Sequence, residues 1–444
     1  TVVKGGTFVG GTGTHTIGSL AMADFDDAKC TLTSGVTTMN GEDSGDNYTI
    51  NIGGASTFAH GSGTVTITRA SDTRIRNAGA ALALNNLIIN HASAVITLAS
   101  NGLTCAGNLT VTAGEFGTGA DKALTVTGAT DVTGTLTLND STVSLGALRA
   151  NSGAAITQGS SGTLELTSAT AGNAAGFGDN YSFRNLDGTS DINFGGTITI
   201  SAANYFEPRT APDYASVINN VVWNDNHYWV GKMTFGGTLV VNASKHMQTY
   251  NGSKDCIVTG DVTINGQLTA LGNNVSAMTF GSLSVASGGT YNATSGTTTI
   301  TKANGGTDGR AFYIHSSATF THNNGLVKFT ASSPQVAPTS TGQTSTSHPF
   351  YDLEQTTGTM QWKAEHHKVL NNCTMKGSAF NGSTGNVHVL GICRLTGETF
   401  NSGDTATNDN NFFQTLIVES GATVDLSAIN ITVGSLRNLG GTIQ

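Results

Sequence analysis

The stretch TYNATSGTTTIT, residues 290–301, is one of three copies of the same unit in this chain. The other copies are TFAHGSGTVTIT at 57–68 and TFTHNNGLVKFT at 319–330. Each copy joins a Thr-aromatic pair to a second strand-like run through a turn of small residues that contains glycine. Period-two alternation predicts short strands buried on one side, and Gly, Asn and Ser provide the tight turns between them. The unit is therefore a repeated strand–turn–strand element.

Other segments repeat as well. FGGTITI at 194–200 returns as FGGTLVV at 235–241, and GGT occurs seven times. An apolar residue followed three positions later by Leu recurs in IGSL (17–20), LNNL (84–87), LGAL (145–148), FRNL (183–186), FGSL (280–283), FYDL (350–353), FQTL (413–416) and VGSL (433–436). A second apolar residue often follows eight positions after that Leu, as Val95 follows Leu87. Repetition on this scale indicates units that bury their apolar faces only by stacking on one another.

These patterns predict an all-β fold, a parallel β-helix (β-solenoid) rod. Helical periodicity is absent, so no crossover helices are expected. Val, Ile, Leu and Phe would point inward and Thr, Ser and Asn outward, with about 20 to 25 residues in each coil. A chain of β-sandwich domains is the alternative, although Trp and Pro are scarce and no linkers divide the sequence into domain-sized segments.

Two stretches interrupt the rhythm and are expected to be excursions from the rod. Residues 201–232 are rich in aromatic residues, and residues 331–349 are rich in Pro, Ser and Thr. The predicted organisation is a β-solenoid at 1–200, an aromatic-rich insertion at 201–232, a β-solenoid at 233–330, a Pro/Ser/Thr-rich loop at 331–349 and a β-solenoid at 350–444. Loops on a repetitive scaffold are common places for function.

Composition excludes several classes of protein. Of the 444 residues only 11% are charged and 37% are hydrophobic, and the net charge is −9. A disordered chain would carry more charge and fewer apolar residues. A nucleic-acid binder would show basic runs, and the Lys and Arg residues form none. No apolar stretch reaches the roughly 18 to 20 residues that span a bilayer, so no membrane insertion is expected. The first residues do not resemble a signal peptide, and a removed leader or anchor stays open.

The aromatic segment is the candidate contact site. Tyr205, Phe206, Tyr214, Trp223, His227, Tyr228 and Trp229 lie there, beside Glu207, Arg209, Asp213 and Asp225 as hydrogen-bonding groups. Flat amphipathic side chains can stack on sugar rings, and protein interfaces also collect them. Two interpretations follow: contact with a glycan or partner, or packing within a widened coil or against a neighbouring subunit.

Catalytic residues are not expected. Hydrolysis of a polysaccharide would need two carboxylates about 5 to 9 Å apart across a groove. The acidic candidates are Asp24, Asp26, Asp27, Asp187, Asp191, Glu207, Asp213 and Asp225. No spacing among them forces two carboxylates together, and solvated turn residues explain them equally well. We therefore predict no enzyme.

No metal site or cofactor is predicted either. GGTGTH at 10–15 lacks the Asp of calcium-binding nonapeptide repeats, and no GGT opens a helix that could hold a phosphate. His366 and His367 are adjacent, so on a strand they would face opposite sides, and a solvated strand edge is their expected place.

The five cysteines form no CxxC pair and are expected to be small buried apolar side chains. Cys373 and Cys393 are 20 residues apart, close to one coil. They are predicted to lie in register on neighbouring coils, with Cα atoms about 4.8 Å apart.

The motifs TFAHGSGTVTIT, FYDLEQTTGT (350–359) and LIVESGATVDL (416–426) resemble those of repeat-rich β-helical phage virion proteins and bacterial surface proteins, such as tail fibres, spikes and adhesins. The resemblance covers most of the chain. It implies an extracellular or virion structural role, often as a homotrimer, and carries over no catalytic residues.

The expected function is a non-enzymatic structural and adhesive part of a phage particle, a fibre, spike or capsid-attached appendage that projects a host- or surface-binding rod. Its expected partners are other virion proteins, further copies of itself and a cell-surface glycan or receptor. The alternatives are a secreted bacterial adhesin or passenger domain at the cell surface, and a polysaccharide-degrading tailspike.

Overall fold

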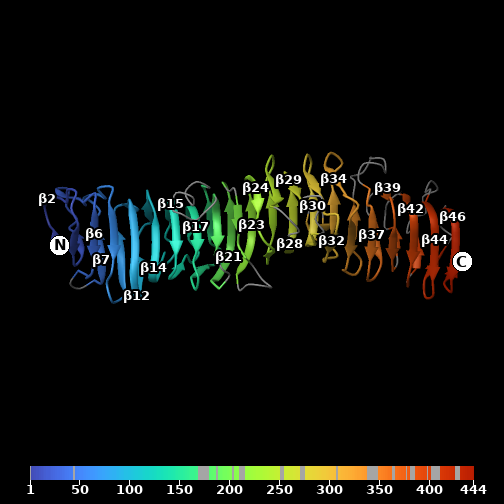
Figure 1. The fold of residues 1–444 in the computed structure, drawn as a ribbon, viewed down its shortest axis with the longest axis horizontal. Helices are drawn as coiled ribbons and strands as arrows, with labels where there is room; N and C mark the ends of the chain where they lie inside the picture. The colour runs from blue at the N-terminus through green and yellow to red at the C-terminus, as the bar shows by residue number, and fades with distance from the viewer. Residues whose placement is uncertain are drawn as a thin grey trace. The chain divides into compact units, whose positions relative to one another are not determined.

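The structure is a computed structural model. It describes residues 2–43, 46–168, 180–186, 189–202, 205–209, 216–250, 255–270, 276–306, 309–337, 349–362, 366–376, 378–380, 386–397, 399–401, 411–425 and 431–444. Contacts divide the chain into two compact units, Thr1–Tyr228 (unit 1) and Trp229–Gln444 (unit 2). Both are built of stacked coils of parallel strands, about 16 turns in the whole chain, and the described residues contain no helix (Figure 1). The predicted parallel β-solenoid is confirmed, and the alternative of β-sandwich domains is wrong.

The strands of unit 1 are two to 13 residues long. They are β1 (Val2–Val3), β2 (Gly6–Val9), β3 (His15–Ile17), β4 (Leu20–Met22), β5 (Ala28–Thr31), β6 (Val36–Met39), β7 (Tyr48–Ile52), β8 (Thr57–Ala59), β9 (Thr64–Ile67), β10 (Thr73–Asn77), β11 (Leu82–Leu84), β12 (Asn86–Leu98), β13 (Leu103–Cys105), β14 (Leu109–Gly117), β15 (Leu124–Val132), β16 (Thr135–Thr137), β17 (Thr142–Ala150), β18 (Ala155–Gln158), β19 (Thr163–Leu166), β20 (Tyr181–Asn185), β21 (Asp191–Ile200), β22 (Tyr205–Glu207) and β23 (Val217–Trp223). β24 (Asn226–Trp229) contains the boundary between the units.

The strands of unit 2 have similar lengths. They are β25 (Met233–Phe235), β26 (Leu239–Val241), β27 (His246–Thr249), β28 (Cys256–Ile264), β29 (Gln267–Thr269), β30 (Met278–Val285), β31 (Thr290–Asn292), β32 (Thr297–Ile300), β33 (Phe312–Ile314), β34 (Thr319–Thr321), β35 (Leu326–Phe329), β36 (Gln335–Ala337), β37 (Asp352–Gln355), β38 (Met360–Trp362), β39 (His366–Val369), β40 (Cys373–Met375), β41 (Ser378–Phe380), β42 (Asn386–Leu395), β43 (Thr399–Asn401), β44 (Asn411–Glu419), β45 (Thr423–Val424), β46 (Ile431–Leu439) and β47 (Thr442–Ile443).

The coils of unit 1 form three parallel ladders, and long strands that bend at a corner belong to two of them. Ladder 1 runs through β11, β13, β15, β17, β19 and β21. Ladder 2 runs through β9, β12, β14, β15, β17, β20 and β22. Ladder 3 runs through β7, β10, β12, β14, β16, β18 and β21. Each coil therefore contributes a strand, or a segment of a bent strand, to each of three faces.

Unit 2 is arranged in the same way. One ladder runs from β25 through β28, β30, β32, β35, β37, β40 and β42 to β44. Two copies of the repeated unit, 290–301 and 319–330, lie on successive coils with Tyr291 opposite Phe320 and Ile300 opposite Phe329. The rings of Tyr291 and Phe320 stack at 5.9 Å. Because the two copies have the same internal spacing, each strand residue of one copy lies opposite the equivalent residue of the other on the next coil.

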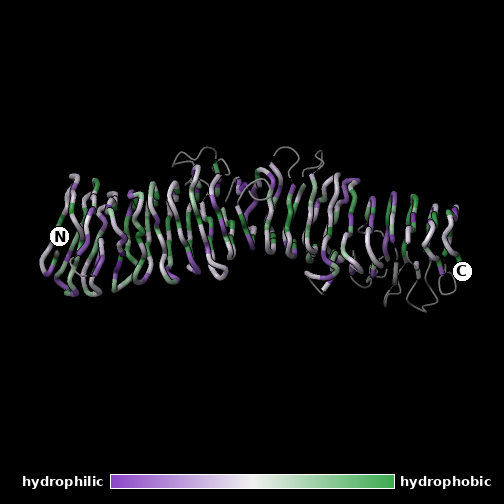
Figure 2. The backbone as a smooth tube through the Cα atoms, turned by 90° about the horizontal axis from the view of Figure 1, so that it is seen from below, coloured by the Kyte–Doolittle hydropathy of each residue, from purple (hydrophilic) through white to green (hydrophobic). Residues whose placement is uncertain are grey.

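Identical inward positions on successive strands make the core. On ladder 1 one such column is aliphatic throughout and at most 1% exposed: Leu103, Leu124, Val143, Leu164, Ile198 and Val221. Burial of each such side chain stabilises the fold by about 1.5 to 3 kcal/mol. Figure 2 shows the resulting alternation of apolar and polar segments along the coils.

Outward positions also form columns. On ladder 3 one outward column reads Thr97, Gly117, Thr137, Thr157 and Asn193, and all of these except the buried Gly117 are at least partly exposed. Neutral hydroxyl and amide groups can bond water on this face, so the protein needs few charges to stay hydrated.

Corners need glycine where coils approach each other. Gly114 bends β14 with a φ of +74°, and a Cβ atom there would lie 2.2 Å from the carbonyl oxygen of His91 on the preceding coil. No larger residue could occupy this corner without moving the backbone.

The predicted excursions lie partly outside the described residues. The segment 201–232 supplies β22, β23 and β24, while its residues 203–204 and 210–215 are not described. The segment 331–349 contains β36, and its residues 338–348 are not described. The domain boundaries proposed from the sequence stay predictions. Among the described residues, no helix has the length and apolar character needed to cross a bilayer.

Candidate binding surface

Three tyrosines form a column on the last coils of unit 1. Tyr181 in β20 lies in register with Tyr205 in β22, and their ring centroids are 5.3 Å apart. Tyr205 in turn stacks on Tyr228 of β24 at 6.2 Å with an interplanar angle of 30°. All three side chains are partly exposed. Parallel strands place equivalent positions one strand spacing apart, which is the separation that ring stacking needs.

An ion-pair cluster borders this column. The guanidinium carbon of Arg184 lies 4.7 Å from the ring centroid of Tyr181. Glu207 lies between two cations, with Arg184 Nε 3.5 Å from its Oε2 and Arg209 Nη2 3.2 Å from its Oε1. Glu207 is only 9% exposed, so this carboxylate is held by its partners rather than by water.

The cluster continues along ladder 2 as a column of charged residues. Asp131, Arg149, Arg184 and Glu207 are successive register partners on β15, β17, β20 and β22. Arg149 Nε donates to Asp131 Oδ1 at 2.9 Å, and Asn151 Nδ2 donates to the same oxygen at 2.6 Å. In a chain with so few charges, four charged residues on consecutive coils make this face distinctive.

The structure describes six of the seven residues of the predicted contact site and divides them into two groups. Phe206, Trp223 and Trp229 are 0% exposed, and Phe206 meets Trp223 edge to face at 6.0 Å. Tyr205, His227 and Tyr228 are partly exposed. Tyr214 lies outside the described residues. Buried aromatic side chains cannot touch a ligand on the surface, so among the described residues of this site only the second group is available for contact.

Ring geometry limits what the tyrosine column can bind. Tyr205 has Tyr181 on one side and Tyr228 on the other, and Tyr181 has Arg184 over its ring. Stacking on a sugar needs a free ring face. The column therefore offers a partner mainly ring edges and hydroxyl groups, and its ring faces hold successive coils together.

Sequence reasoning missed Tyr181, Arg184 and Arg149. The first two lie in YSFRNL at 181–186, and alignment of this segment with YFEPR at 205–209 would have placed Tyr181 against Tyr205. Recognising Arg149 would have required the register of ladder 2, because nothing near it in sequence repeats the pattern.

The described acidic candidates are spread over the chain. Asp24, Asp26, Asp27 and Asp191 are exposed, and Asp24 Oδ1 accepts a hydrogen bond from the backbone N–H of Ala55 at 2.6 Å. Asp225 Oδ2 lies 3.0 Å from His227 Nδ1. Asp187 and Asp213 lie outside the described residues. In the part of the chain that the structure describes, no three His, Cys, Asp or Glu side chains gather closely enough to hold a metal ion.

The histidine pair corrects one expectation. His367 is 0% exposed, and its ring lies 4.2 Å from that of Trp362, so a solvated strand edge is the wrong place for it. It faces inward on β39 because its neighbours in that ladder bury the same side, with Val387 as its register partner. The side chain of His366 lies outside the described set.

A shallow groove of about 350 Å³ follows the corner between ladders 2 and 3. Ala92 to Val95, Gly114, Glu115, Thr133 to Thr135 and Gly153 line it. Glu115 is the only ionisable residue in this lining. With small side chains and exposed backbone, the groove offers hydrogen bonds but no assembled acid and base.

Comparison with known proteins adds no relative: no protein-family model, curated protein or solved structure matches this chain.

Proposed function

We propose that this protein is a non-enzymatic structural and adhesive component of a phage particle, part of a fibre, spike or capsid-attached appendage. The observation that supports the proposal is the stack of coils with aliphatic columns inside and neutral hydroxyl columns outside. The aliphatic column on ladder 1 and the Thr97 to Asn193 column on ladder 3 illustrate the two sides. The resemblance of its repeats to those of β-helical virion proteins agrees with this role.

The physical argument concerns durability. Within each ladder the backbone groups of a strand are paired on both sides, and each coil buries its apolar column against the coils above and below. Repeat proteins of this kind gain stability from every added interface. Such a scaffold suits a particle outside the cell, where no chaperone repairs it.

Adhesion is assigned to the outer faces. The tyrosine column and the charged column of ladder 2 lie beside each other, and Tyr181 and Arg184 join them. Aromatic and arginine side chains are enriched at binding surfaces. These faces would meet another virion protein, a further copy of the chain or a cell-surface receptor.

The proposed role is tested by locating the protein on virions or on cells. Antibodies raised against the purified chain would be used for immunogold electron microscopy of particles and cells from cultures of the producing organism. Label on virions is expected. Label confined to cell envelopes would favour the alternative of a bacterial surface adhesin, and label restricted to the cell interior would contradict both roles.

A second measurement addresses the enzyme alternative. The purified protein would be incubated with host capsule or lipopolysaccharide, and new reducing ends would be counted. None is expected. Steady release of reducing ends would replace the adhesive proposal with a polysaccharide-degrading tailspike.

A further inference from the structure

Two arginine side chains project from the same side of one strand in unit 1. β10 has the sequence TRIRN, in which Thr73 and Ile75 are 1% exposed and point inward. Alternate residues of a strand share a side, so Arg74 and Arg76 both point outward. Arg74 is exposed and Arg76 is partly exposed.

Both guanidinium groups lie over a single aromatic ring. Tyr48 begins β7, the neighbouring strand of ladder 3, and is the register partner of Arg74. The guanidinium carbons of Arg74 and Arg76 lie 5.0 and 5.9 Å from the ring centroid of Tyr48. Each contact at such a site is worth about 0.5 to 1 kcal/mol. We call Tyr48, Arg74 and Arg76 the arginine–tyrosine patch.

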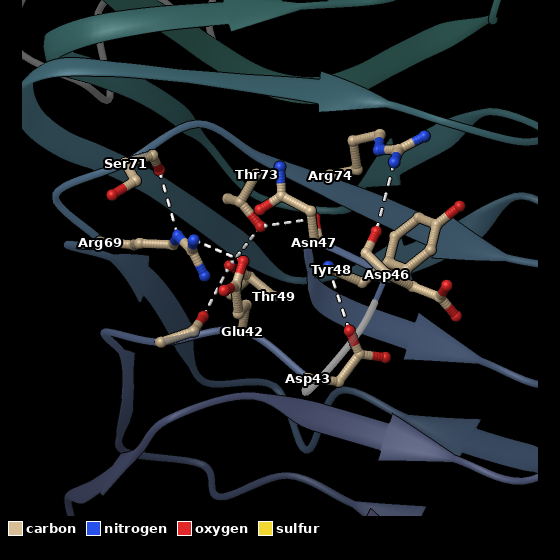
Figure 3. A network of polar contacts seen from close by, with 11 residues as sticks. Glu42, Asp43, Asp46, Asn47, Tyr48, Thr49, Arg69, Ser71, Thr73 and Arg74 are labelled. Carbon is tan, nitrogen blue, oxygen red and sulfur yellow. Dashed lines mark hydrogen bonds and ion pairs between the residues drawn. The ribbon is translucent and has the colours of Figure 1, made fainter.

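Hydrogen bonds hold Tyr48 and Arg74 of the patch in place, as Figure 3 shows. The backbone N–H of Tyr48 donates to Asp43 Oδ1 at 3.2 Å, and Thr73 Oγ1 donates to the Asn47 carbonyl at 3.1 Å. Arg74 Nη2 donates to the Asp46 carbonyl at 3.2 Å. The backbone of Tyr48 and the guanidinium group of Arg74 are thus held in place before any ligand arrives, which lowers the entropic cost of binding.

Neither guanidinium group of this patch forms an ion pair with a described carboxylate, although Asp43 and Asp46 lie beside Tyr48. Arg76 makes no hydrogen bond or ion pair with any described residue, and the only such partner of Arg74 among them is a neutral carbonyl. Arg69, close by in sequence, pairs with Glu42 instead. The carboxylate of Asp43 is already occupied by the N–H of Tyr48 and by Asn51 Nδ2.

Most of the other arginines in the described part of the chain pair with a carboxylate. Arg149 pairs with Asp131, Arg184 and Arg209 with Glu207, and Arg394 with Glu419. In a chain with a net charge of −9, two adjacent guanidinium groups without a carboxylate are unusual. Their free N–H donors are suited to a planar carboxylate, which they can bind in a bidentate manner.

We propose that the arginine–tyrosine patch binds the carboxylate group of an acidic polysaccharide, and this proposal rests on the adhesive function proposed above. The register partners of the two arginines on the adjacent strands are neutral: Asn51 lies opposite Arg76, and Thr97 lies opposite Arg74. Amide and hydroxyl groups of this kind can bond sugar hydroxyls beside the carboxylate. A nucleic acid would need a longer series of cations to follow its phosphates.

Binding would be measured with three acidic polysaccharides and with an uncharged counterpart of one of them. The full chain would be immobilised on a biosensor and exposed to polygalacturonate, alginate and polysialate, and to fully methyl-esterified polygalacturonate as the uncharged counterpart. Binding to at least one acidic polymer, and none to the ester, is expected. Equal binding of ester and acid, or binding to none of the three acidic polymers, would overturn the proposal.

The variants test the residues. In Arg74→Gln/Arg76→Gln the apparent affinity should fall about tenfold to a hundredfold, because charge-assisted hydrogen bonds are lost. Arg437→Gln is the matched control, since Arg437 is also an exposed arginine with no carboxylate partner among the described residues. An equal loss in this control would show a general charge effect and contradict a specific patch. Unchanged circular dichroism and melting temperature would show that the variants fold.

Two further outcomes separate this proposal from others. Binding to phosphatidylglycerol vesicles or inorganic phosphate, but to no carboxylated polymer, would replace the carboxylate by a phosphate ligand. A chain found on virions that binds no acidic polymer would overturn the patch and leave the structural and adhesive function intact.

Discussion

Cys373 and Cys393 lie opposite each other on the adjacent parallel strands β40 and β42, and both side chains are completely buried. The prediction from their spacing of 20 residues is confirmed. A side-chain hydrogen bond with Cys373, together with burial, raises the pKa of the Cys393 thiol well above its usual value. The pair occupies a core column between Leu353 and Leu416, where thiols act as small apolar side chains.

Buried thiols should make the protein sensitive to alkali. Burial raises the pKa of Cys105 and of Cys256 to about 12, against 9.0 for an ordinary thiol. Above pH 9 the unfolded chain loses these protons while the folded chain keeps them, so the free energy of unfolding falls as pH rises. The expected loss is about 1.4 kcal/mol per pH unit for each thiol. Urea unfolding on both sides of this pH measures it.

Cys256→Ala is the control for this effect. It removes one titrating thiol, so its stability should fall less steeply with pH than that of the parent, whatever its absolute stability. If the free energy of unfolding fell equally steeply with pH in both proteins, the raised pKa of Cys256 would not be the cause of the alkali sensitivity. In addition, a thiol reagent should modify the five cysteines only after the protein is unfolded, because all five are free and buried.

Gly114→Ala should destabilise unit 1. The substitution places a Cβ atom 2.2 Å from the His91 carbonyl oxygen and forces alanine into a φ of +74°. We expect a loss of about 2 kcal/mol or more in the free energy of unfolding. Gly153→Ala is matched to it, because Gly153 has the same φ of +74° but nothing within 4 Å of the added atom. This variant should lose about 1 kcal/mol from backbone strain alone. Equal losses of stability in the two variants would show that the close contact between Gly114 and the His91 carbonyl does not explain the need for glycine at this corner.

Tyr205→Ala should weaken the contact between successive coils. The variant removes the central ring of the tyrosine column and with it two ring contacts. The expected cost is about 1 to 3 kcal/mol, measured by chemical denaturation. Tyr205→Phe keeps the ring and should cost much less. If the two variants were equally destabilised, the hydroxyl group rather than ring stacking would carry the contribution.

Glu207→Gln should destabilise the fold, because it removes the carboxylate partner of Arg184 and Arg209. The change leaves Arg184 and Arg209 beside a neutral amide in a site where Glu207 is nearly buried. Loss of one partner from such a buried pair typically costs about 3 to 5 kcal/mol. Asp191→Asn, an exposed carboxylate in the same unit, should change stability by less than about 0.5 kcal/mol. Similar effects from the two substitutions would mean that the ion-pair cluster adds nothing to the fold.

The amino-acid sequence by itself determined the kind of fold. Period-two alternation, glycine turns and repeated units such as 290–301 and 319–330 predict stacked parallel coils, and the same regularity places Cys373 opposite Cys393. The reason is physical: an apolar column forms only if equivalent positions recur once per coil, so the inward pattern must be visible in the sequence.

Only the tertiary structure decided which outward side chains meet. Register partners on ladder 2 are separated by 18 residues from Asp131 to Arg149 but by 35 from Arg149 to Arg184, because turns differ in length. Outward side chains do not pack in the core, so their residue types need not recur once per coil. The charged column and the arginine–tyrosine patch are therefore not visible as a repeat in the sequence. Tyr48 and Arg76 become neighbours because β7 and β10 pair in ladder 3, and this pairing exists only in the folded chain.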